Sequence, residues 1–285
     1  MTAALSSPAR KSAAQHLVRT PSFEEATARL QFLVDQGSRV GLLTGAQGSG
    51  KTTLLSRIAE GLRAEGCLTA HFSAAAIGPE ELLYAVAAGL QAAVEPDWNL
   101  FRLRRAVNDR LLELRFLRGQ AVILLDDAGH APTDLLPHLY RLVHDEAAAD
   151  ARLTLVLATT RESSVRLGRS LLDLVDLRID LPSWSVDETR VLIDMTGDRE
   201  RPIRFAASAV ERVCELADGA PRGILRLAQQ ARLAASAEGL DYVDATTVDG
   251  VHAELGVTAR AGYYRLPARL TASQMNWRQG AAAVQ

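Results

Sequence analysis

The chain is poor in cysteine, in aromatic residues and in long apolar runs. Its 285 residues include only two cysteines, Cys67 and Cys214. These lie far apart without partners at metal-ligand spacing, which excludes a disulfide framework and a cysteine-based zinc site. No apolar stretch approaches the ~20 residues of a membrane span, and no signal-peptide core follows the N-terminus. We expect a protein without membrane insertion, in the reducing cytoplasm.

Neither sign of charge dominates the chain. The formal net charge is -2, with 48% hydrophobic and 23% charged residues, which is close to the globular average. A chain of this length can bury a large core in one or two domains. The balanced charge excludes chain-wide attraction to nucleic acid or to a membrane surface, so any such binding needs a local patch or assembly.

Short apolar segments alternate with amphipathic ones in the first two thirds of the chain. This pattern predicts an α/β fold with a doubly wound parallel sheet, in which ligands bind at the carboxyl ends of the strands. The five expected strands are Arg39–Leu43, Leu68–Phe72, Ala121–Leu125, Leu153–Ala158 and Leu177–Leu181. The helices expected between them are Thr52–Ala64, Pro79–Val94, Leu100–Leu117 and Leu135–Glu146, followed by a polar helical segment to about Val175.

After Ser185 the pattern changes to helices only, which indicates a separate helical subdomain. The expected helices are Val186–Met195, Ala206–Ala217, Ile224–Ala237 and Ala245–Leu255, with a hinge at Pro182 and a connector at Gly197–Pro202. We therefore divide the chain into a flexible leader (1–20), an α/β nucleotide-binding domain (21–182), a helical lid subdomain (183–255) and a tail (256–285).

The run from Gly45 to Thr52 follows the first expected strand and opens a helix. It matches the phosphate-binding loop G-x-x-x-x-G-K-[ST]. Glycines let backbone N–H groups curl around a phosphate, Lys51 reaches its oxygens, and Thr52 offers a hydroxyl to Mg²⁺. The alternative is a glycine-rich turn that contains lysine by chance. The residues expected to bind a nucleoside triphosphate are Gly45, Ala46, Gln47, Gly48, Ser49, Gly50, Lys51, Thr52 and Thr53.

Acidic and hydroxyl side chains end two later strands. Asp126 is expected to hold Mg²⁺ opposite Thr52, and Asp127 to polarise the attacking water, although its side chain is one methylene shorter than glutamate. Thr159 and Thr160 end the next strand, where either can orient water or sense the γ-phosphate. The alternative for the acidic pair is capping of a turn, and threonine is also a common strand residue.

Three further basic features have two interpretations each. Arg222 begins a helix of the second region and can reach phosphate from there, or lie at the surface. His130 follows the acidic pair and either senses nucleotide or is solvated. The arginines of 102–118 either meet a phosphate backbone or form a solvated face, since acidic residues interleave them.

These motifs, in this order and spacing, resemble the AAA+ ATPases over roughly residues 20 to 255. Within that family the chain is similar to the bacterial group that contains the secretion-pathway A ATPases and the ATP-binding helper proteins of transposition. The segment 126–130 is similar to that group's acidic strand end, with one extra residue before His130. The sequence Gly219-Ala220-Pro221-Arg222 carries the Gly-x-Pro-Arg signature, so the resemblance implies a sensor arginine at Arg222.

The resemblance weakens at the arginine finger, which completes a neighbour's site in the ring. Its expected position falls near Leu174, which is not basic, and Arg169 and Arg178 are the nearby alternatives. The resemblance implies ATP and Mg²⁺ as ligands, a homo-oligomeric ring or filament, and double-stranded DNA or a DNA-bound protein as partner.

The leading hypothesis is an ATPase that uses Lys51, Asp127, Thr160 and Arg222 in catalysis. The first alternative is an ATP-gated switch with little turnover that recruits a protein partner such as secretion machinery. The second is a small-molecule kinase, which the helical C-terminal region disfavours.

Overall fold

We describe the protein from a computed structural model. It describes residues 20–144, 151–197 and 203–261, with side chains as far as residue 256. The expected leader, Glu146, most of the connector at 197–202 and the tail beyond residue 261 therefore lie outside the described residues. No helix in the described ranges is both long enough and apolar enough to cross a bilayer.

Five parallel strands form the central sheet in the order β2-β3-β4-β1-β5. Each strand begins at, or one residue after, the position that the sequence predicts, and the expected α/β fold is confirmed. β1 lies between β4 and β5, so β4 separates it from β3. The strands are β1 (Val40–Gly45), β2 (Leu68–Ser73), β3 (Ala121–Asp126), β4 (Leu153–Thr159) and β5 (Leu177–Leu181).

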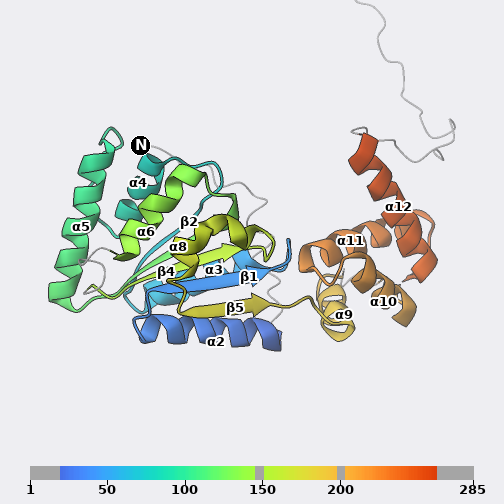
Figure 1. The fold of residues 1–285 in the computed structure, drawn as a ribbon. Coiled ribbons are helices and arrows are strands. Elements are labelled where there is room, and N and C mark those ends of the chain that lie inside the picture. Colours follow the sequence, from blue (N-terminus) through green and yellow to red (C-terminus); the bar gives the residue numbers. More distant parts are fainter. Residues whose placement is uncertain (1–19, 145–150, 198–202, 262–285) are drawn as a thin grey trace, which may run out of the picture.

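Helices cover both faces of this sheet (Figure 1). α2 (Pro21–Asp35) and α3 (Lys51–Ala64) pack on one face, against Val122 and Leu124 of β3. On the other face, which includes Ile123, the packed helices are α4 (Pro79–Gly89), α5 (Leu100–Leu117), α6 (Leu136–His144) and α8 (Gly168–Leu172). Alternate residues of one strand thus enter two cores, which is why the strand is apolar throughout. Before α6 and α8 the chain forms the 3₁₀ turns η1 (Ala128–His130), η2 (Thr133–Leu135) and η3 (Ser163–Leu167).

α4 is shorter than the sequence predicts. We expected it to continue to about Val94, and it ends at Gly89. Gln91 takes a left-handed conformation (φ 58°), and the N–H of Ala92 returns to the carbonyl of Ala87, which closes the helix end. Glutamine does not indicate this conformation in a sequence, so the prediction wrongly included the residues after Gly89 in the helix.

The C-terminal region builds a separate core from α9 (Val186–Met195), α10 (Ala207–Leu216), α11 (Pro221–Ala237) and α12 (Ala245–Ala261). Ser185 and Glu188 form a capping box at the start of α9. The expectation of helices only was wrong, because β6 (Arg204–Phe205) pairs in parallel with β7 (Tyr242–Val243). These strands hold two residues each, too few to show an alternating pattern. α12 also extends to Ala261, beyond the expected end at Leu255.

The end of α4 provides a test of this packing. A Cβ added at Gly89 would lie 2.4 Å from Ala70 Cβ and 2.5 Å from Ala70 Cα, so α4 would have to move away from β2. We expect Gly89→Ala to lower the free energy of unfolding by about 1–3 kcal/mol. Gly61→Ala is the matched control within α3, where an added Cβ meets nothing within 4 Å. It should raise stability by about 0.4–1 kcal/mol. Urea unfolding measures both, and equal effects would contradict the packing.

Candidate nucleotide site

The loop from Gly45 to Thr52 connects the carboxyl end of β1 to the first turn of α3. Gly48 (φ 79°) and Gly50 (φ 103°) both adopt left-handed backbone conformations, which residues with a Cβ adopt only with strain. Gly50 is also the N-cap residue immediately before α3, and no side chain caps this end of the helix. The free N–H groups of the helix start thus remain available for an anion.

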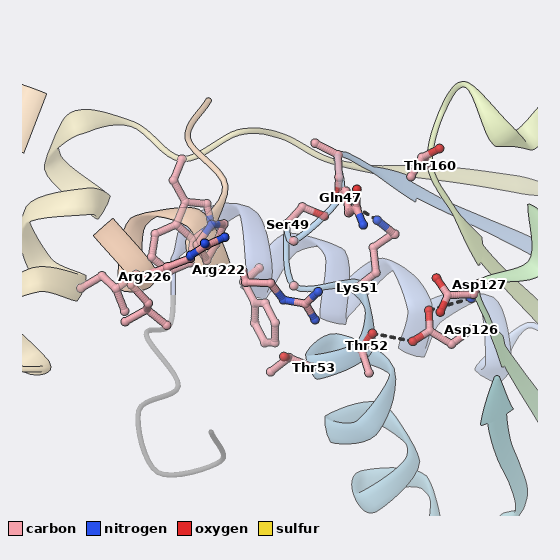
Figure 2. Close-up of a pocket in the computed structure, with 18 of the residues that line it drawn as sticks. Gln47, Ser49, Lys51, Thr52, Thr53, Asp126, Asp127, Thr160, Arg222 and Arg226 are labelled. Atoms are coloured by element: carbon pink, nitrogen blue, oxygen red, sulfur yellow. Dashed lines mark hydrogen bonds between the residues drawn. The ribbon is translucent and has the colours of Figure 1, made fainter. Parts of the chain in front are cut away.

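Lys51 folds back over this loop. Its Nζ donates to the backbone carbonyls of Gly45 and Ala46, both at 2.8 Å, and the side chain is buried (Figure 2). Burial lowers the pKa of Lys51 below its ordinary value, and Arg222 acts in the same direction, while Asp126 and Asp127 oppose the shift. The ammonium group therefore lies against the loop, where it donates hydrogen bonds to two carbonyl groups that a phosphate can replace.

Thr52 and Asp126 meet beside the loop. Thr52 Oγ1 donates to Asp126 Oδ2 at 2.5 Å, and the backbone N–H of Asp127 donates to the other oxygen of Asp126. A hydroxyl and a buried carboxylate, both on rigid elements, are the hard oxygen ligands that Mg²⁺ takes. This donor set fits the expected magnesium ion.

Asp127 and Thr160 line the same cavity from two neighbouring strand ends. Asp127 is exposed and left-handed (φ 50°), and Thr160 Oγ1 accepts from the N–H of Ser163. Hydrogen bonds from the backbone N–H of Glu162 and from the Thr160 hydroxyl lower the pKa of the Glu162 carboxyl, which also lines the cavity. His130 lies at the cavity wall too. Their roles stay predictions.

Thr159 differs from its neighbour Thr160. Its Oγ1 is buried, and among the described residues it has no hydrogen-bond partner. A Cβ added at Gly129 would lie 2.3 Å from this oxygen, so the turn after β3 packs directly on the end of β4. Thr159 thus supports the turn that presents Asp127, while Thr160 faces the cavity.

The second wall of the cavity comes from the C-terminal helices. The backbone N–H of Arg222, in the first turn of α11, donates to the carbonyl of Gly48 at 3.3 Å. Figure 2 shows the Arg222 side chain extending over the loop toward Thr52. The cavity between loop and helix has a volume of about 1060 Å³.

Sequence reasoning did not identify most of this second wall. Arg226 lies one turn after Arg222 on α11, and Pro221 stands beside Arg222 in the Gly-x-Pro-Arg signature, so spacing could have indicated both. Glu162 and Ser163 directly follow Thr160, and no local pattern distinguishes the remaining lining residues. The lining residues that were missed are Phe23, Glu162, Ser163, Trp184, Leu192, Thr196, Pro221, Leu225, Arg226 and Gln229.

The two arginine-finger alternatives lie outside this set. Arg169 Nε is 3.6 Å from Asp173 Oδ2 on an exposed surface, and Arg178 is exposed on β5. Neither is among the described residues that line the cavity. A contribution to the site of a neighbouring copy stays a prediction.

Comparison with known proteins assigns the fold and motifs to a class. Residues 34–167 match the family model described as an AAA domain. The chain is 27% identical over 253 residues to general secretion pathway protein A of Aeromonas hydrophila, covering 86% of this chain and 44% of that protein. The chain thus spans less than half the length of this relative.

Solved structures share the fold at lower identity. The Thermotoga maritima RuvB Holliday junction branch migration motor matches with a TM-score of 0.55 and 20% identity, over 81% of this chain and 67% of RuvB. Cdc6p of Pyrobaculum aerophilum matches with a TM-score of 0.64 and 16% identity, over 83% of this chain and 66% of Cdc6p. The Aeropyrum pernix ORC1 protein, solved in complex with DNA, matches with a TM-score of 0.60 and 21% identity, over 86% of this chain and 68% of ORC1.

The fold and site define an α/β P-loop nucleotide-binding protein. More narrowly, the chain carries the fold and motifs of the AAA+ P-loop ATPases and resembles general secretion pathway protein A, as its sequence predicts.

The contact between Gly48 and Arg222 can be tested directly. Gly48→Ala and Gly66→Ala both place a Cβ on a left-handed residue, which costs about 1–2 kcal/mol of stability. Only at Gly48 would the new Cβ lie against Arg222, 3.1 Å from its Cβ, whereas Gly66 faces open space. We expect the amide of Arg222 to exchange hydrogen faster in Gly48→Ala and unchanged in Gly66→Ala. Equal exchange in the two variants would show that the loop and α11 are not in contact.

Proposed function

We propose that the chain binds ATP with Mg²⁺ in the cavity between the phosphate loop and α11, and hydrolyses it. The observation that carries the proposal is the convergence of Lys51, Thr52, Asp126 and Arg222, from three elements, around one glycine loop. Two of them are cationic and would face the phosphates from opposite walls. The match of residues 34–167 to the AAA domain model supports nucleotide binding in general.

The loop and the residues around it bind different parts of the nucleotide in this proposal. Backbone N–H groups and the start of α3 bind the phosphates, and Lys51 exchanges its carbonyl partners for phosphate oxygens. Thr52 and Asp126 would hold Mg²⁺, which when bound supplies positive charge against the phosphate oxygens. The cavity lining from the C-terminal region includes Trp184, Leu192 and Leu225, whose apolar side chains would contact the base.

Hydrolysis requires a water aligned with the γ-phosphate. Asp127 orients that water and accepts its proton, and Thr160 fixes its position from the next strand end. Arg222 places positive charge where it develops in the transition state. Because Arg222 belongs to α11, loss of the γ-phosphate would release the helices α9–α12 from the loop, and this change of angle would drive assembly or a change of shape.

The proposed oligomer rests on the resemblance to the AAA+ ATPases, and the proposed partner rests on the comparisons. RuvB is named as a branch migration motor and ORC1 was solved with DNA, which supports action on double-stranded DNA or on a DNA-bound protein. This is an argument from similar folds. We propose a ring or filament in which Arg169 or Arg178 completes a neighbour's site. The cytoplasmic location stays a prediction.

A specific observation favours the alternative, an ATP-gated switch. Asp127 is one methylene shorter than the glutamate of related ATPases, and Leu174, the position expected for the arginine finger, is not basic. Such a protein would hold ATP with negligible turnover and recruit a protein partner, such as secretion machinery.

Because the chain contains few lysines, chemical labelling of their amines tests whether ATP binds at Lys51. Lys51 is one of two lysines, the other being Lys11, among 32 lysine and arginine residues. We expect saturating MgATP to slow labelling of Lys51 by an amine-reactive reagent on the order of tenfold or more, because phosphate and bound ligand cover its Nζ. Lys11, outside the described residues, is the internal reference. Mass spectrometry of the two peptides measures the ratio.

Two controls accompany the labelling experiment. Lys51→Ala should weaken ATP binding about 30-fold or more, the loss expected when a hydrogen bond to a charged group is removed. Chelation of Mg²⁺ should reduce the protection of Lys51. If labelling of Lys51 and Lys11 responds equally to MgATP, the proposed site is wrong.

Turnover distinguishes the ATPase from the switch. We expect Asp127→Asn to lower steady-state hydrolysis by on the order of 100-fold, with ATP binding retained, because the proton acceptor is lost. Asp218→Asn is the matched control, since Asp218 is also exposed and left-handed (φ 50°) but is not a lining residue. The assay is run with and without double-stranded DNA. ATP binding with background turnover in wild type under both conditions would establish the switch.

A further inference from the structure

A second cavity is lined by residues of α4, α5 and α6, which lie together at the end of the molecule remote from α9–α12 (Figure 1). Its volume is about 370 Å³, within the range of about 300–1,000 Å³ that is typical of small-molecule sites. Leu83, Tyr140 and Leu142 form an apolar part of its wall. We call this cavity the α5–α6 pocket. It shares no described lining residue with the nucleotide cavity.

Basic side chains line the α5–α6 pocket from two helices. Arg104 comes from α5, and His138, Arg141 and His144 follow one another at intervals of three residues on α6. No acidic residue is among the described residues that line the pocket. The pocket therefore concentrates positive charge, although the whole chain has a formal net charge of -2.

Arg104 and His138 meet inside this pocket. Arg104 Nη2 lies 2.8 Å from His138 Nδ1. Because a guanidinium group only donates hydrogen bonds, Nδ1 accepts, and the imidazole carries its hydrogen on Nε2. Burial lowers the pKa of His138, Arg104 and Arg141 lower it further, and Asp134 opposes them. The charges of both arginines therefore act on this imidazole ring, which keeps an N–H group to donate.

The position of Arg141 has a simpler explanation that does not extend to Arg104. Arg141 and His144 lie in the last turn of α6, where positive charge is favourable in any helix. Arg104 approaches from α5 instead. Arg141 is exposed and has no hydrogen-bond or ion-pair partner within the described ranges. Two guanidinium groups thus flank one imidazole, and no described carboxylate on the pocket wall compensates them.

We propose that the α5–α6 pocket binds the phosphate group of an organic phosphate ester. A carboxylate offers two oxygens in one plane, whereas the oxygens of a phosphate group point in several directions and can accept from both helices. Arginine clusters are a common means of recognising phosphate groups in proteins. Arg104, Arg141 and Nε2 of His138 would donate to the phosphate, and the apolar part of the wall would contact the organic group.

The ester has two possible sources with the same phosphate chemistry. One is a free small molecule, and the other is the backbone of double-stranded DNA, the partner proposed above. Binding of a free ester does not rest on the proposed ATPase activity, because the two cavities have separate described linings. Titrations with each source distinguish them.

Histidine NMR of the full chain tests the proposal, because the chain contains only six histidines. His138 and His144 report the α5–α6 pocket, His130 reports the nucleotide cavity, and His252, exposed on α12, is the reference. We expect glycerol 3-phosphate to shift the His138 signal saturably at millimolar concentration, with pH and ionic strength held constant. Acetate should shift it much less. Duplex DNA is titrated separately, and His138→Gln assigns the signal.

Paired variants test whether the two arginines bind the phosphate. Arg104→Gln with Arg141→Gln should raise the dissociation constant about tenfold or more, because charge-assisted hydrogen bonds are lost. Arg102→Gln with Arg105→Gln is the matched control, since it removes the same charge from exposed residues of α5 that do not line the pocket. Thermal unfolding verifies that each variant folds. Arg141→Gln alone replaces the pair if the pair does not fold, because Arg141 has no described partner to lose.

The titrations separate the possible outcomes. A saturable shift of His138 with glycerol 3-phosphate, weakened by the Arg104 and Arg141 variants, would identify a free ester as the ligand. The same result with DNA alone would identify the DNA backbone. The proposal would be overturned by equal shifts with acetate, by equal weakening in the control pair, or by a His138 signal that no titration moves. A shift of His130 alone would place phosphate in the nucleotide cavity only, and would also overturn it.

Discussion

The parallel register of β3, β4 and β1 is the constraint on which the site depends. Thr44 pairs with Thr159, and Leu125 pairs with Leu157. Gly45 and Asp126 therefore end their strands, and Thr160 follows the end of β4, at the same edge of the sheet. A slip of one residue would turn Asp126 to the opposite face, away from Thr52. Two separate cores prevent this slip, because each strand buries alternate residues on both faces.

The second wall depends on a link between the sheet and the C-terminal helices. The N–H of Trp184 donates to the carbonyl of Gly219 at 2.8 Å, and the thiol of Cys214 donates to the carbonyl of Trp184. Gly219 is left-handed, and a Cβ there would lie 2.6 Å from the Trp184 carbonyl. This close contact ties the segment that leaves β5 to the turn that begins α11, so the position of Arg222 follows that of this segment.

The sequence predicted those parts of the molecule that local physics decides. The strands and the phosphate loop could be predicted from apolar runs, from glycines and from polar residues at strand ends. The predicted end of α4 was wrong, because nothing in the sequence indicates the left-handed conformation of Gln91. The residues Ala46 to Thr53, which the sequence pattern picked out, line the cavity, and their binding roles stay predictions. Trp184 and Leu192 were not, because their place in the cavity is set by tertiary contacts of a distant segment, and nothing in their local pattern distinguishes them from core residues.

The contact between loop and α11 has the strength that a switch requires. A hydrogen bond such as that from Arg222 N–H to Gly48 contributes about 0.5–1.5 kcal/mol net, so it biases the position of α11 without fixing it. The Arg222 guanidinium remains available for phosphate, and a phosphate that binds it adds charge-assisted hydrogen bonds of about 1.5–3 kcal/mol. A ligand shifts an equilibrium only by its difference in affinity for the two states. That difference can come here from one side chain, because Arg222 approaches the loop only when α11 does.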